Sequence, residues 1–489
     1  MNTHLLALQL MALQGCLGAF DTLYHHELSE ALPQRVTARL ELSIHAARSL
    51  IYSLLFAGLA FWTWQGAWAW VLLGLFIVEI VLTLWDFVIE DRSRLLPATE
   101  RVTHTVLAVN GGAFIALLAM NMPQWQAAET GLAYTPHGGL GIFLALCGVG
   151  VGLSGWRDAL AARRLWRLAA EDEAGAEETL RFGSGAKRFL LTGGTGFIGQ
   201  LLVHALLRDG HEVILLARNP RQAAWTFDGR VSCVASLDEL PAARRVDIVV
   251  NLAGASILGW PWTAARRAAL RRSRVALTEN LVAWMARAEH KPGLLLSASA
   301  IGYYGRQALD DRSELNEDAA PQDIFMSRLC SEWEQAARGA EAHGVTVVRM
   351  RFALVLGQRG ALPMLLLPVR LGLGGRLGSG RQTMAWIHVR DLLAGVAHLC
   401  RQHERGGLAN GAFNFAAPES LPQLEFSRTA ARLAHRPCLL PLPAWPLRLL
   451  LGEQTDLLLE GQRAVPQRLH ASGFRFRYPG LQGALASLM

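Results

Sequence analysis

Long apolar runs alternate with short polar segments in the first third of the chain. A helix needs roughly 20 apolar residues to cross a bilayer core, so the longest run qualifies alone and the others qualify with their flanks. This pattern predicts an all-α transmembrane helical domain over residues 1–156, with about five spans. The runs are residues 5–20, 49–64, 67–88, 105–120 and 140–156. The first run has no basic segment before it, which favours a first span over a cleaved signal peptide.

Arginines orient these predicted spans. Segments 21–48 and 89–102 and the stretch after residue 156 all carry arginines, whereas the turn at Gln65 and the 121–139 loop carry no Lys or Arg. Because positive charge marks the cytoplasmic side, the N-terminus is expected outside and everything after Arg157 inside. We therefore expect a multi-pass protein of the inner (cytoplasmic) membrane.

Ionisable residues gather at the cytoplasmic ends of the predicted spans. Glu41 and His45, like Glu100 and His104, are four residues apart, so each pair shares a helix face. A polar stripe runs down the third span. Its members are Glu79, Thr83, Asp86 and Glu90, and the same cytoplasmic side is expected to hold His25, His26, Glu27 and Asp91.

Two interpretations of these residues stay open. Carboxylates within a span are costly and often functional, and His with carboxylates suits several transition metals or a proton relay. The alternative is ion pairing with Arg48, Arg92 and Arg94 together with interfacial solvation. Ion pairing is the favoured interpretation because no spacing here is a known metal signature, so no metal ligand is assigned.

Residues 157–186 join the two halves of the chain. The first part has the basic amphipathic pattern of a juxtamembrane helix. An acidic stretch rich in Gly and Ala follows and ends in Gly183, Ser184 and Gly185, which is typical of a linker.

The pattern then changes to apolar strands alternating with helices. A short apolar strand at 189–191 leads into a glycine-rich turn, and an apolar helix follows from Gln200. In this setting backbone N–H groups at the helix start approach a pyrophosphate closely. The turn therefore predicts a dinucleotide-binding domain over residues 187–420. Its candidate cofactor-binding residues are Gly193, Thr195, Gly196, Phe197, Ile198 and Gly199.

Three further strands extend the prediction to a Rossmann-like, doubly wound parallel sheet. The strand at 212–217 ends in Arg218, and an arginine there accommodates a 2′-phosphate, which favours NADP(H) over NAD(H). Strands at 246–252 and 293–296 are continuously apolar, as expected when both faces of a sheet are covered. Small residues at their ends let the cofactor approach, namely Ala253, Gly254 and Ser297. Residues 421–489 are expected to form a small C-terminal α+β lobe.

Composition excludes two other classes of function. The net charge of +7 comes almost wholly from arginines that form no basic stripe with interleaved aromatics, so nucleic acid is not an expected partner. The six cysteines are scattered without a CxxC pair, which argues against a disulfide framework or a structural zinc. A small-molecule or lipid substrate and the membrane are the expected partners, and the oligomeric state is left open.

From residue 187 onward the chain resembles the extended short-chain dehydrogenase/reductase superfamily, also called NAD-dependent epimerase/dehydratases. The matching motifs lie at residues 192–199, 251–254, 297–305, 351–357 and 386–391. The chain resembles more closely an atypical branch of this superfamily, which carries a small C-terminal domain of unknown function. That likeness rests on residues 372–382, 449–453 and 473–479.

The resemblance implies a Tyr-x-x-x-Lys pair that works with a Ser as a general acid–base system. Ser299 matches the serine position. The pair itself is absent, because the two lysines, Lys187 and Lys291, are preceded at the required spacing by Gly183 and Arg287. Met326 and Cys330 occupy the two expected places on the helix.

Three functions therefore stay open. The first is an NADP(H)-dependent oxidoreductase or epimerase that acts on a small or lipid-like carbonyl or sugar substrate. Its expected catalytic residues are Ser299 and Tyr303. Tyr304 is the neighbouring candidate, and His388 is a remote one. The second is a catalytically inactive nucleotide-binding module that regulates the membrane domain. The third is a membrane domain with its own metal-dependent or transport activity.

The resemblance also implies how the cleft is built. A mobile glycine-rich loop is expected at 372–380, with Arg381 and Trp386 either bordering the substrate or packing. His388 and Asp391 are expected to hold the C-terminal lobe in place. The cleft lining should include Ser299, Tyr303, Tyr304, Arg351 and residues 357–362.

Overall fold

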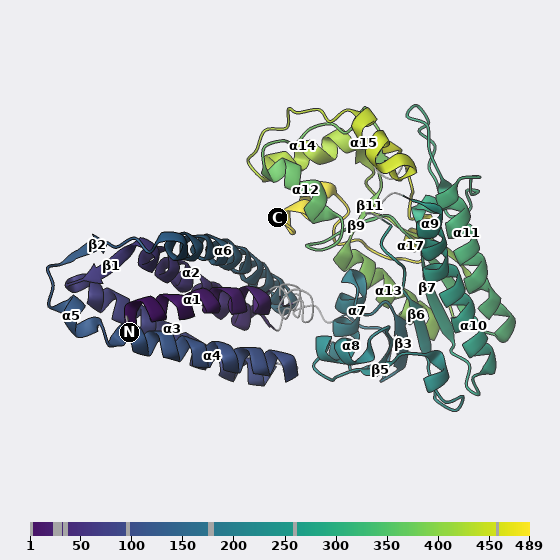
Figure 1. The fold of residues 1–489 in the computed structure, drawn as a ribbon. Coiled ribbons are helices and arrows are strands. Elements are labelled where there is room, and N and C mark those ends of the chain that lie inside the picture. Colours follow the sequence, from purple (N-terminus) through teal and green to yellow (C-terminus); the bar gives the residue numbers. More distant parts are fainter. Residues whose placement is uncertain are drawn as a thin grey trace. The chain divides into compact units, whose positions relative to one another are not determined.

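The chain forms two compact units, Met1–Glu177 and Glu178–Met489. A computed structural model describes residues 3–22, 32, 38–93, 98–174, 180–257, 262–455 and 459–489 (Figure 1). His25, His26, Glu27 and Arg94 lie outside the described residues. Each unit is described by itself.

Five long helices make up most of the first unit, and each is long and apolar enough to cross a membrane. Within this unit α2 packs along α6 and α1 packs along α4. The helices are α1 (Thr3–Phe20), α2 (Arg39–Phe61), α3 (Ala67–Ser93), α4 (Ala98–Ala119) and α6 (Gly138–Ala174).

Glycines on α6 bring it close to α2. A Cβ added to Gly148 would lie 3.2 Å from the backbone nitrogen of Ala57, and one on Gly152 would lie 2.7 Å from the Ser53 hydroxyl. The Ser53 hydroxyl donates to the Gly148 carbonyl at 2.8 Å. Small residues that let backbones approach in this way are the usual basis of helix packing where water is excluded.

The two ends of this bundle differ in chemistry. At one end β1 (Trp62–Gln65) pairs antiparallel with β2 (Gly131–Tyr134) beside the short helix α5 (Met122–Gln126). The polar residues lie at the other end. The helix α6 runs unbroken from the apolar run into the basic stretch, so the expected juxtamembrane helix is the continuation of the fifth apolar helix.

A seven-stranded parallel sheet forms the centre of the second unit, in the order β12-β8-β7-β6-β3-β4-β5. The chain starts in the middle at β3, moves to one edge and then crosses over to β6. This confirms the predicted doubly wound sheet and places the reversal of strand order between β3 and β6. The strands are β3 (Arg188–Thr192), β4 (Glu212–Leu216), β5 (Ser232–Val234), β6 (Ile248–Asn251), β7 (Leu294–Ala300), β8 (Thr346–Phe352) and β12 (Gly411–Phe415).

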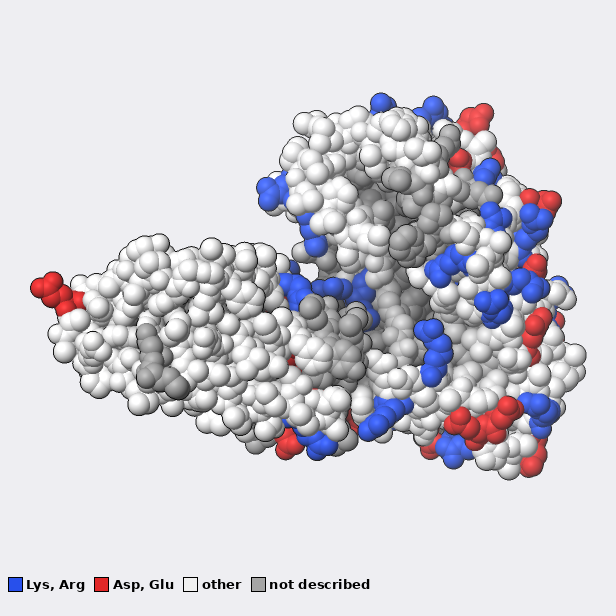
Figure 2. All heavy atoms as spheres, in the orientation of Figure 1, with Lys and Arg blue, Asp and Glu red and all other residues white. Residues whose placement is uncertain are grey.

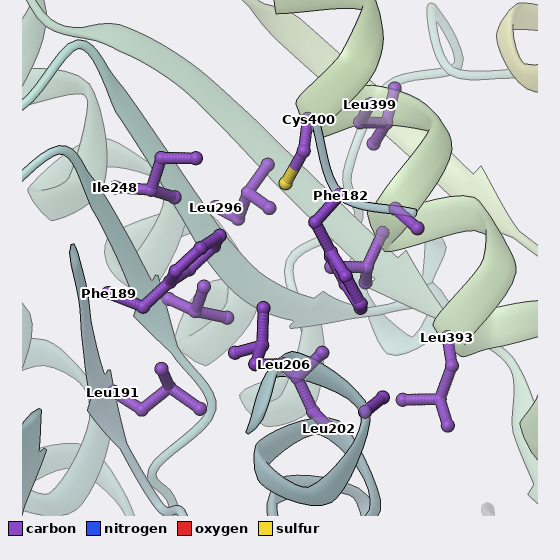
Figure 3. Packing of buried hydrophobic residues seen from close by; sticks show 14 of the residues in the cluster. Phe182, Phe189, Leu191, Leu202, Leu206, Ile248, Leu296, Leu393, Leu399 and Cys400 are labelled. Atoms are coloured by element: carbon purple, nitrogen blue, oxygen red, sulfur yellow. The ribbon is translucent and has the colours of Figure 1, made fainter. Parts of the chain in front are cut away.

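Helices cover both faces of this sheet, which explains the continuously apolar strands. On one face Phe189 and Leu191 pack against α7 (Phe197–Arg208) and α13 (Val389–Glu404), as Figure 3 shows. On the other face Leu190 packs in a cluster with α10 (Leu277–Arg287) and the end of α11 (Phe325–Arg338). Successive residues of β3 thus serve opposite layers, as the two-residue period of a strand requires.

The C-terminal lobe draws on two separate parts of the chain. Its helices surround a core that contains the fully buried Trp386. Its helices are α12 (Leu362–Arg370), α14 (Gln423–Leu433), α15 (Ala444–Leu451) and α18 (Leu481–Ala486). Two short strand pairs complete the lobe. The strand β9 (Leu354–Leu356) pairs with β11 (Trp386–His388), and β10 (Thr383–Met384) pairs with β13 (Leu421–Pro422).

Backbone pairing inside this lobe corrects one expectation. Segment 372–380 does not form an isolated loop. It pairs with segment 438–442, because the Gly378 and Leu442 amides donate to the Leu442 and Arg376 carbonyls at 2.9 and 2.8 Å. A Cβ added to Gly375 would lie 1.8 Å from the Leu440 carbonyl oxygen, so the glycine permits this close pairing.

Candidate cofactor site at the crossover of the sheet

The glycine turn lies at the point where the strand order reverses. Gly193 has a φ of +71°, and a Cβ added to Gly199 would lie 2.2 Å from the Gly193 carbonyl oxygen. The helix α7 therefore starts directly against the turn. Gly196 caps it without a side-chain hydrogen bond, and the first N–H groups of such a helix attract an anion. The predicted residues from Gly193 to Gly199 thus form a cradle that fits a pyrophosphate.

A second segment covers this turn. Gly357 and Gly360 pack against the Phe197 ring, since a Cβ on Gly357 would lie 2.3 Å from the ring's Cζ. Between them Arg359 hydrogen-bonds through its guanidinium to the side chain of Gln200, in the first turn of α7. The 357–362 stretch therefore borders the cradle as expected. Arg359 adds a cation that the sequence motif alone did not single out.

Arg218 lies just beyond the end of β4 and is exposed. The end of β4 is next to the turn, because a Cβ added to Gly194 would lie 2.6 Å from the Leu215 side chain. Asn219 then caps α8 (Pro220–Thr226) by accepting from the Gln222 amide at 3.2 Å. Arg218 is therefore exposed at the carboxyl end of β4, the strand end that borders the glycine turn.

A buried polar network ties the strand ends together beneath the cradle. The Thr192 hydroxyl donates to the Asn251 side chain at 2.6 Å, and Asn251 donates to the Thr278 and Ser297 hydroxyls at 2.8 and 3.3 Å. The Ala253 amide donates to Thr192 at 3.1 Å. Ser297 is 1% exposed, so its hydroxyl fixes the strand ends from within.

Gly254 lies at the surface next to this network. A Cβ added to it would lie 2.9 Å from the guanidinium carbon of Arg274, which donates to the Ala255 carbonyl at 2.9 Å. Both Gly254 and the half-buried Ala253 follow β6 and border the cradle, as predicted.

A second buried network contains the expected catalytic serine. The Ser299 hydroxyl donates to Glu334 at 2.8 Å, and Arg351 binds both oxygens of Glu334 at 2.8 and 3.0 Å. Arg351 also donates to the Tyr304 hydroxyl at 2.9 Å, which donates to Asn414 at 2.6 Å. Ser299, Tyr304 and Arg351 are each about 2% exposed. The expectation that these three line the cleft is therefore wrong.

Electrostatics favours this network as it stands. Burial by itself lowers the pKa of Arg351, but its hydrogen bonds to the Glu334 carboxylate raise the pKa above the ordinary value. Burial raises the pKa of Tyr304 to about 12, so its hydroxyl keeps its proton at neutral pH. Arg351 and Glu334 thus form a buried charged pair, and Ser299 and Tyr304 complete its hydrogen bonds.

Tyr303 is the half-exposed member of the predicted pair of tyrosines. Its ring lies over the Arg351 guanidinium, with 3.6 Å between the Arg351 Cζ and the ring centroid, which is a cation–π contact. On the adjacent helix α11, Met326 and Cys330 occupy the two places where the family carries its Tyr and Lys. Both lie next to Gly302, since a Cβ added to Gly302 would lie 3.5 Å from Met326 and 3.8 Å from Cys330. Burial raises the pKa of the Cys330 thiol to about 12, so it is a poor proton donor.

His388 and Asp391 join the sheet to the C-terminal lobe, as expected. His388 accepts from the Arg390 amide at 3.1 Å and stacks on Tyr478 with ring centroids 4.0 Å apart. Asp391 accepts from the amides of Arg477 and Tyr478 at 2.8 and 2.9 Å. Trp386 is likewise a core residue, so the packing alternative holds for it.

Comparison with known proteins agrees with this geometry. Residues 189–416 match the NAD dependent epimerase/dehydratase family, and residues 442–488 match a domain of unknown function, DUF1731. Epimerase family protein YfhF of Bacillus subtilis is 36% identical over 307 residues, which cover 61% of this chain and 97% of that protein. The chain belongs to the NAD dependent epimerase/dehydratase family. This membership confirms the resemblance found in the sequence.

Other members of the epimerase family show the same extent of similarity. Epimerase family protein SDR39U1 of Bos taurus is 37% identical over 307 residues, covering 62% of this chain and 99% of that protein. A crystal structure of human SDR39U1 with NADPH is 35% identical with a TM-score of 0.55, covering 62% of this chain and 98% of that one. These relatives correspond in length to the epimerase-like part of the chain.

Removal of the Glu334 charge should destabilise the second unit. The substitution Glu334→Gln leaves the Arg351 charge buried without a carboxylate, which costs about 3–5 kcal/mol of unfolding free energy. Denaturant titration of the full chain measures this loss. The matched control is Glu332→Gln on the same helix, where the exposed pair with Arg271 contributes about 0–1 kcal/mol. Equal losses for both variants would contradict the interpretation.

His388 should make the second unit acid-sensitive. Burial, with the charges of Arg390 and Arg477, lowers its pKa from 6.5 to about 3. The unfolded chain therefore binds the proton more tightly, so the stability given by neutral His388 is present above pH of about 6.5 and is lost as the pH falls toward 3.

The substitution His388→Asn tests this, because Asn also caps a helix start. Between pH 6 and 4 the unfolding free energy of the wild type should fall more steeply than that of the variant, by up to about 1.4 kcal/mol per pH unit. Denaturant titrations at several pH values measure the two slopes. Identical slopes would show that folding does not lower the pKa of His388.

Proposed function

We propose that this epimerase family member is an NADP(H)-dependent oxidoreductase with a non-standard active site, held at a membrane by its first unit. The observation that carries the proposal is the cradle from Gly193 to Gly199 at the crossover of the sheet, with Arg218 beside it. A helix start free of a side-chain cap suits the pyrophosphate, and an exposed arginine after the second strand suits a 2′-phosphate. The NADPH complex of human SDR39U1, a relative at 35% identity, supports the same cofactor.

The residues of this chain would act around the bound cofactor in defined ways. NADPH, when bound, supplies a hydride to a carbonyl carbon. The carbonyl oxygen then needs a proton, and Tyr303 is the half-exposed hydroxyl next to the cradle's strand ends that offers one. Arg351 lies beneath the Tyr303 ring, and Glu334 and Ser299 fix Arg351. Ser299 would then be a positioning residue.

An apolar surface on the C-terminal lobe supports a lipid-like substrate. The face over α12, α14 and α15 carries few charged side chains (Figure 2). Large exposed apolar patches mark protein, membrane or ligand interaction sites. Its side chains are each at least half exposed, namely Met364, Leu367, Leu371, Leu373, Leu439, Leu440 and Trp445. With five helices able to cross a bilayer in the same chain, a membrane-derived carbonyl or sugar compound is the substrate class we favour.

A regulatory role without turnover is the second candidate. Met326 and Cys330 favour it, because they replace the residues that would exchange and tune the proton. In that case the second unit binds NADP(H) and reports the cofactor's redox state to the first unit.

Arg218 should decide which cofactor binds. In Arg218→Ala the contact to the 2′-phosphate is lost, so we expect the Kd for NADPH to rise by about tenfold to a hundredfold and the Kd for NADH to stay within a factor of about two. Fluorescence titration of the full chain in detergent measures both constants. Arg230→Ala is the control, because Arg230 is an exposed arginine before β5, at the amino ends of the strands, and both constants should stay unchanged. A parallel loss of NADPH and NADH binding would contradict the assignment.

Tyr303 distinguishes the two candidate functions. If the second unit is a reductase, the wild type oxidises NADPH with apolar carbonyl or quinone compounds, and Tyr303→Phe lowers kcat by about a hundredfold or more without changing the Kd for NADPH. Spectrophotometric NADPH oxidation over a broad panel is the assay. Tight NADPH binding with no turnover by the wild type would overturn the reductase proposal and leave the regulatory one.

A further inference from the structure

The polar end of the first unit brings five possible metal ligands together from three helices. Glu41 and His45 lie near the start of α2, Glu90 lies near the end of α3, and Glu100 and His104 lie near the start of α4. The three carboxylates are fully buried, and the two imidazoles are 7% and 11% exposed. Buried charges are paired with other groups or coordinate metals, and ionisable residues within apolar helices are by default functional candidates.

These five residues form two triads that share one member. In the triad Glu41, His45 and Glu90, each residue offers a ligand atom, and these atoms all lie within 4.8 Å of one another. The same is true of the triad of Glu90, Glu100 and His104. Ligands of one ion with bonds of about 2.1 Å stand up to about 4.2 Å apart. Small side-chain rotations would therefore close each triad on an ion.

Glu90 presents one oxygen to each triad. Its Oε1 lies 3.7 Å from the Nε2 of His45, and its Oε2 lies 3.2 Å from the Nδ1 of His104. A carboxylate oriented in this way can bridge two ions, one through each oxygen. Two-metal sites in helical bundles likewise take a Glu and a His from each of two helices together with further Glu carboxylates, although here the Glu and His of each pair are four residues apart and one further Glu is shared.

Further carboxylates orient the two imidazoles. The Nε2 of His104, on the opposite side of the ring from Glu90, lies 3.2 Å from Asp21. A carboxylate that holds a histidine from behind is a regular feature around metal sites, because it fixes the ring and makes the other nitrogen a better ligand. Asp86 lies 2.8 Å from the Nε2 of His45, the same nitrogen that faces Glu90, and so holds that ring from the side of the triad.

The sequence favoured ion pairing for the polar stripe on α3, and the structure shows this pairing at Glu79 and Asp86. Arg48 binds Asp86 at 2.7 Å and Glu79 at 3.3 Å, and Thr83 donates to Glu79 at 2.8 Å. Glu79 is thus satisfied by a cation and a hydroxyl of the protein. Glu90 lies three turns farther along α3, where its two oxygens face the imidazoles of His45 and His104, which can also serve as metal ligands.

We propose that the first unit binds a pair of divalent first-row transition metal ions, with Glu90 as the bridging ligand. Glu41 and His45 hold one ion, and Glu100 and His104 hold the other. Two imidazoles among three carboxylates suit iron or manganese, since imidazole favours iron, copper, nickel and zinc and carboxylate favours harder ions such as manganese. The site is separate from the cofactor cradle and does not depend on the function proposed for the second unit.

Metal content of the full chain in detergent tests the proposal. Chelator-stripped wild type is dialysed against Mn²⁺ or, without oxygen, against Fe²⁺, and bound metal is measured by mass spectrometry. We expect about two ions per chain and, for Mn²⁺, the electron paramagnetic resonance spectrum of a coupled pair. His45→Ala and His104→Ala should each bind about half as much metal and lose the coupling. Glu90→Gln should lose binding of both ions.

Glu79→Gln is the matched control, because it removes another buried carboxylate of α3 that pairs with Arg48. It should keep both ions. Size-exclusion chromatography and circular dichroism identify any variant that fails to fold, and the coupled spectrum of the wild type stands independently of the variants. Less than about a fifth of an ion per chain in saturated wild type, an uncoupled Mn²⁺ spectrum, or equal metal in Glu90→Gln and Glu79→Gln would each overturn the proposal.

Discussion

The buried pairing of Arg351 with Glu334 constrains the whole region around the ends of the strands. Two charges can leave water together only when their hydrogen bonds are satisfied, and here Ser299 and Tyr304 complete them. These side chains come from β7, from the turn that follows it, from β8 and from α11. The pairing therefore fixes the position of α11 on the sheet. It also occupies the hydroxyl of Ser299, which leaves Tyr303 as the half-exposed polar side chain of this strand end.

Much of this fold follows from local sequence. The parallel strands are continuous apolar runs, and the glycine turn after β3 has the spacing that a close strand–helix turn requires, so the prediction of a doubly wound sheet was confirmed. The five apolar helices likewise matched the five apolar runs. The basic stretch after residue 156 was predicted as a separate juxtamembrane helix, whereas it continues α6 without a break. A charge pattern alone does not show whether two helical segments are joined.

The site was harder to predict than the fold, for a physical reason. A motif tells which residue stands at a strand end, but the direction of a hydroxyl depends on partners that are distant in sequence. Ser299 lies 35 residues from Glu334, and nothing local reveals that pair. The same holds for segment 372–380, where five glycines and a serine suggested a mobile loop, whereas the segment pairs with residues 438–442, which are distant in sequence. Pairs within one helix turn, such as Glu41 with His45, were visible from spacing alone, whereas Glu90 joined them only in three dimensions.

The unbroken helix α6 has a mechanical consequence. Its 37 residues make a rod about 55 Å long at about 1.5 Å per residue, whereas the hydrocarbon layer of a bilayer is about 30 Å thick. In a bilayer, about 25 Å of this rod would therefore stand outside the apolar layer as a rigid post. Bilayer thickness and helix tilt together would set how far the end of α6 stands from the lipid surface.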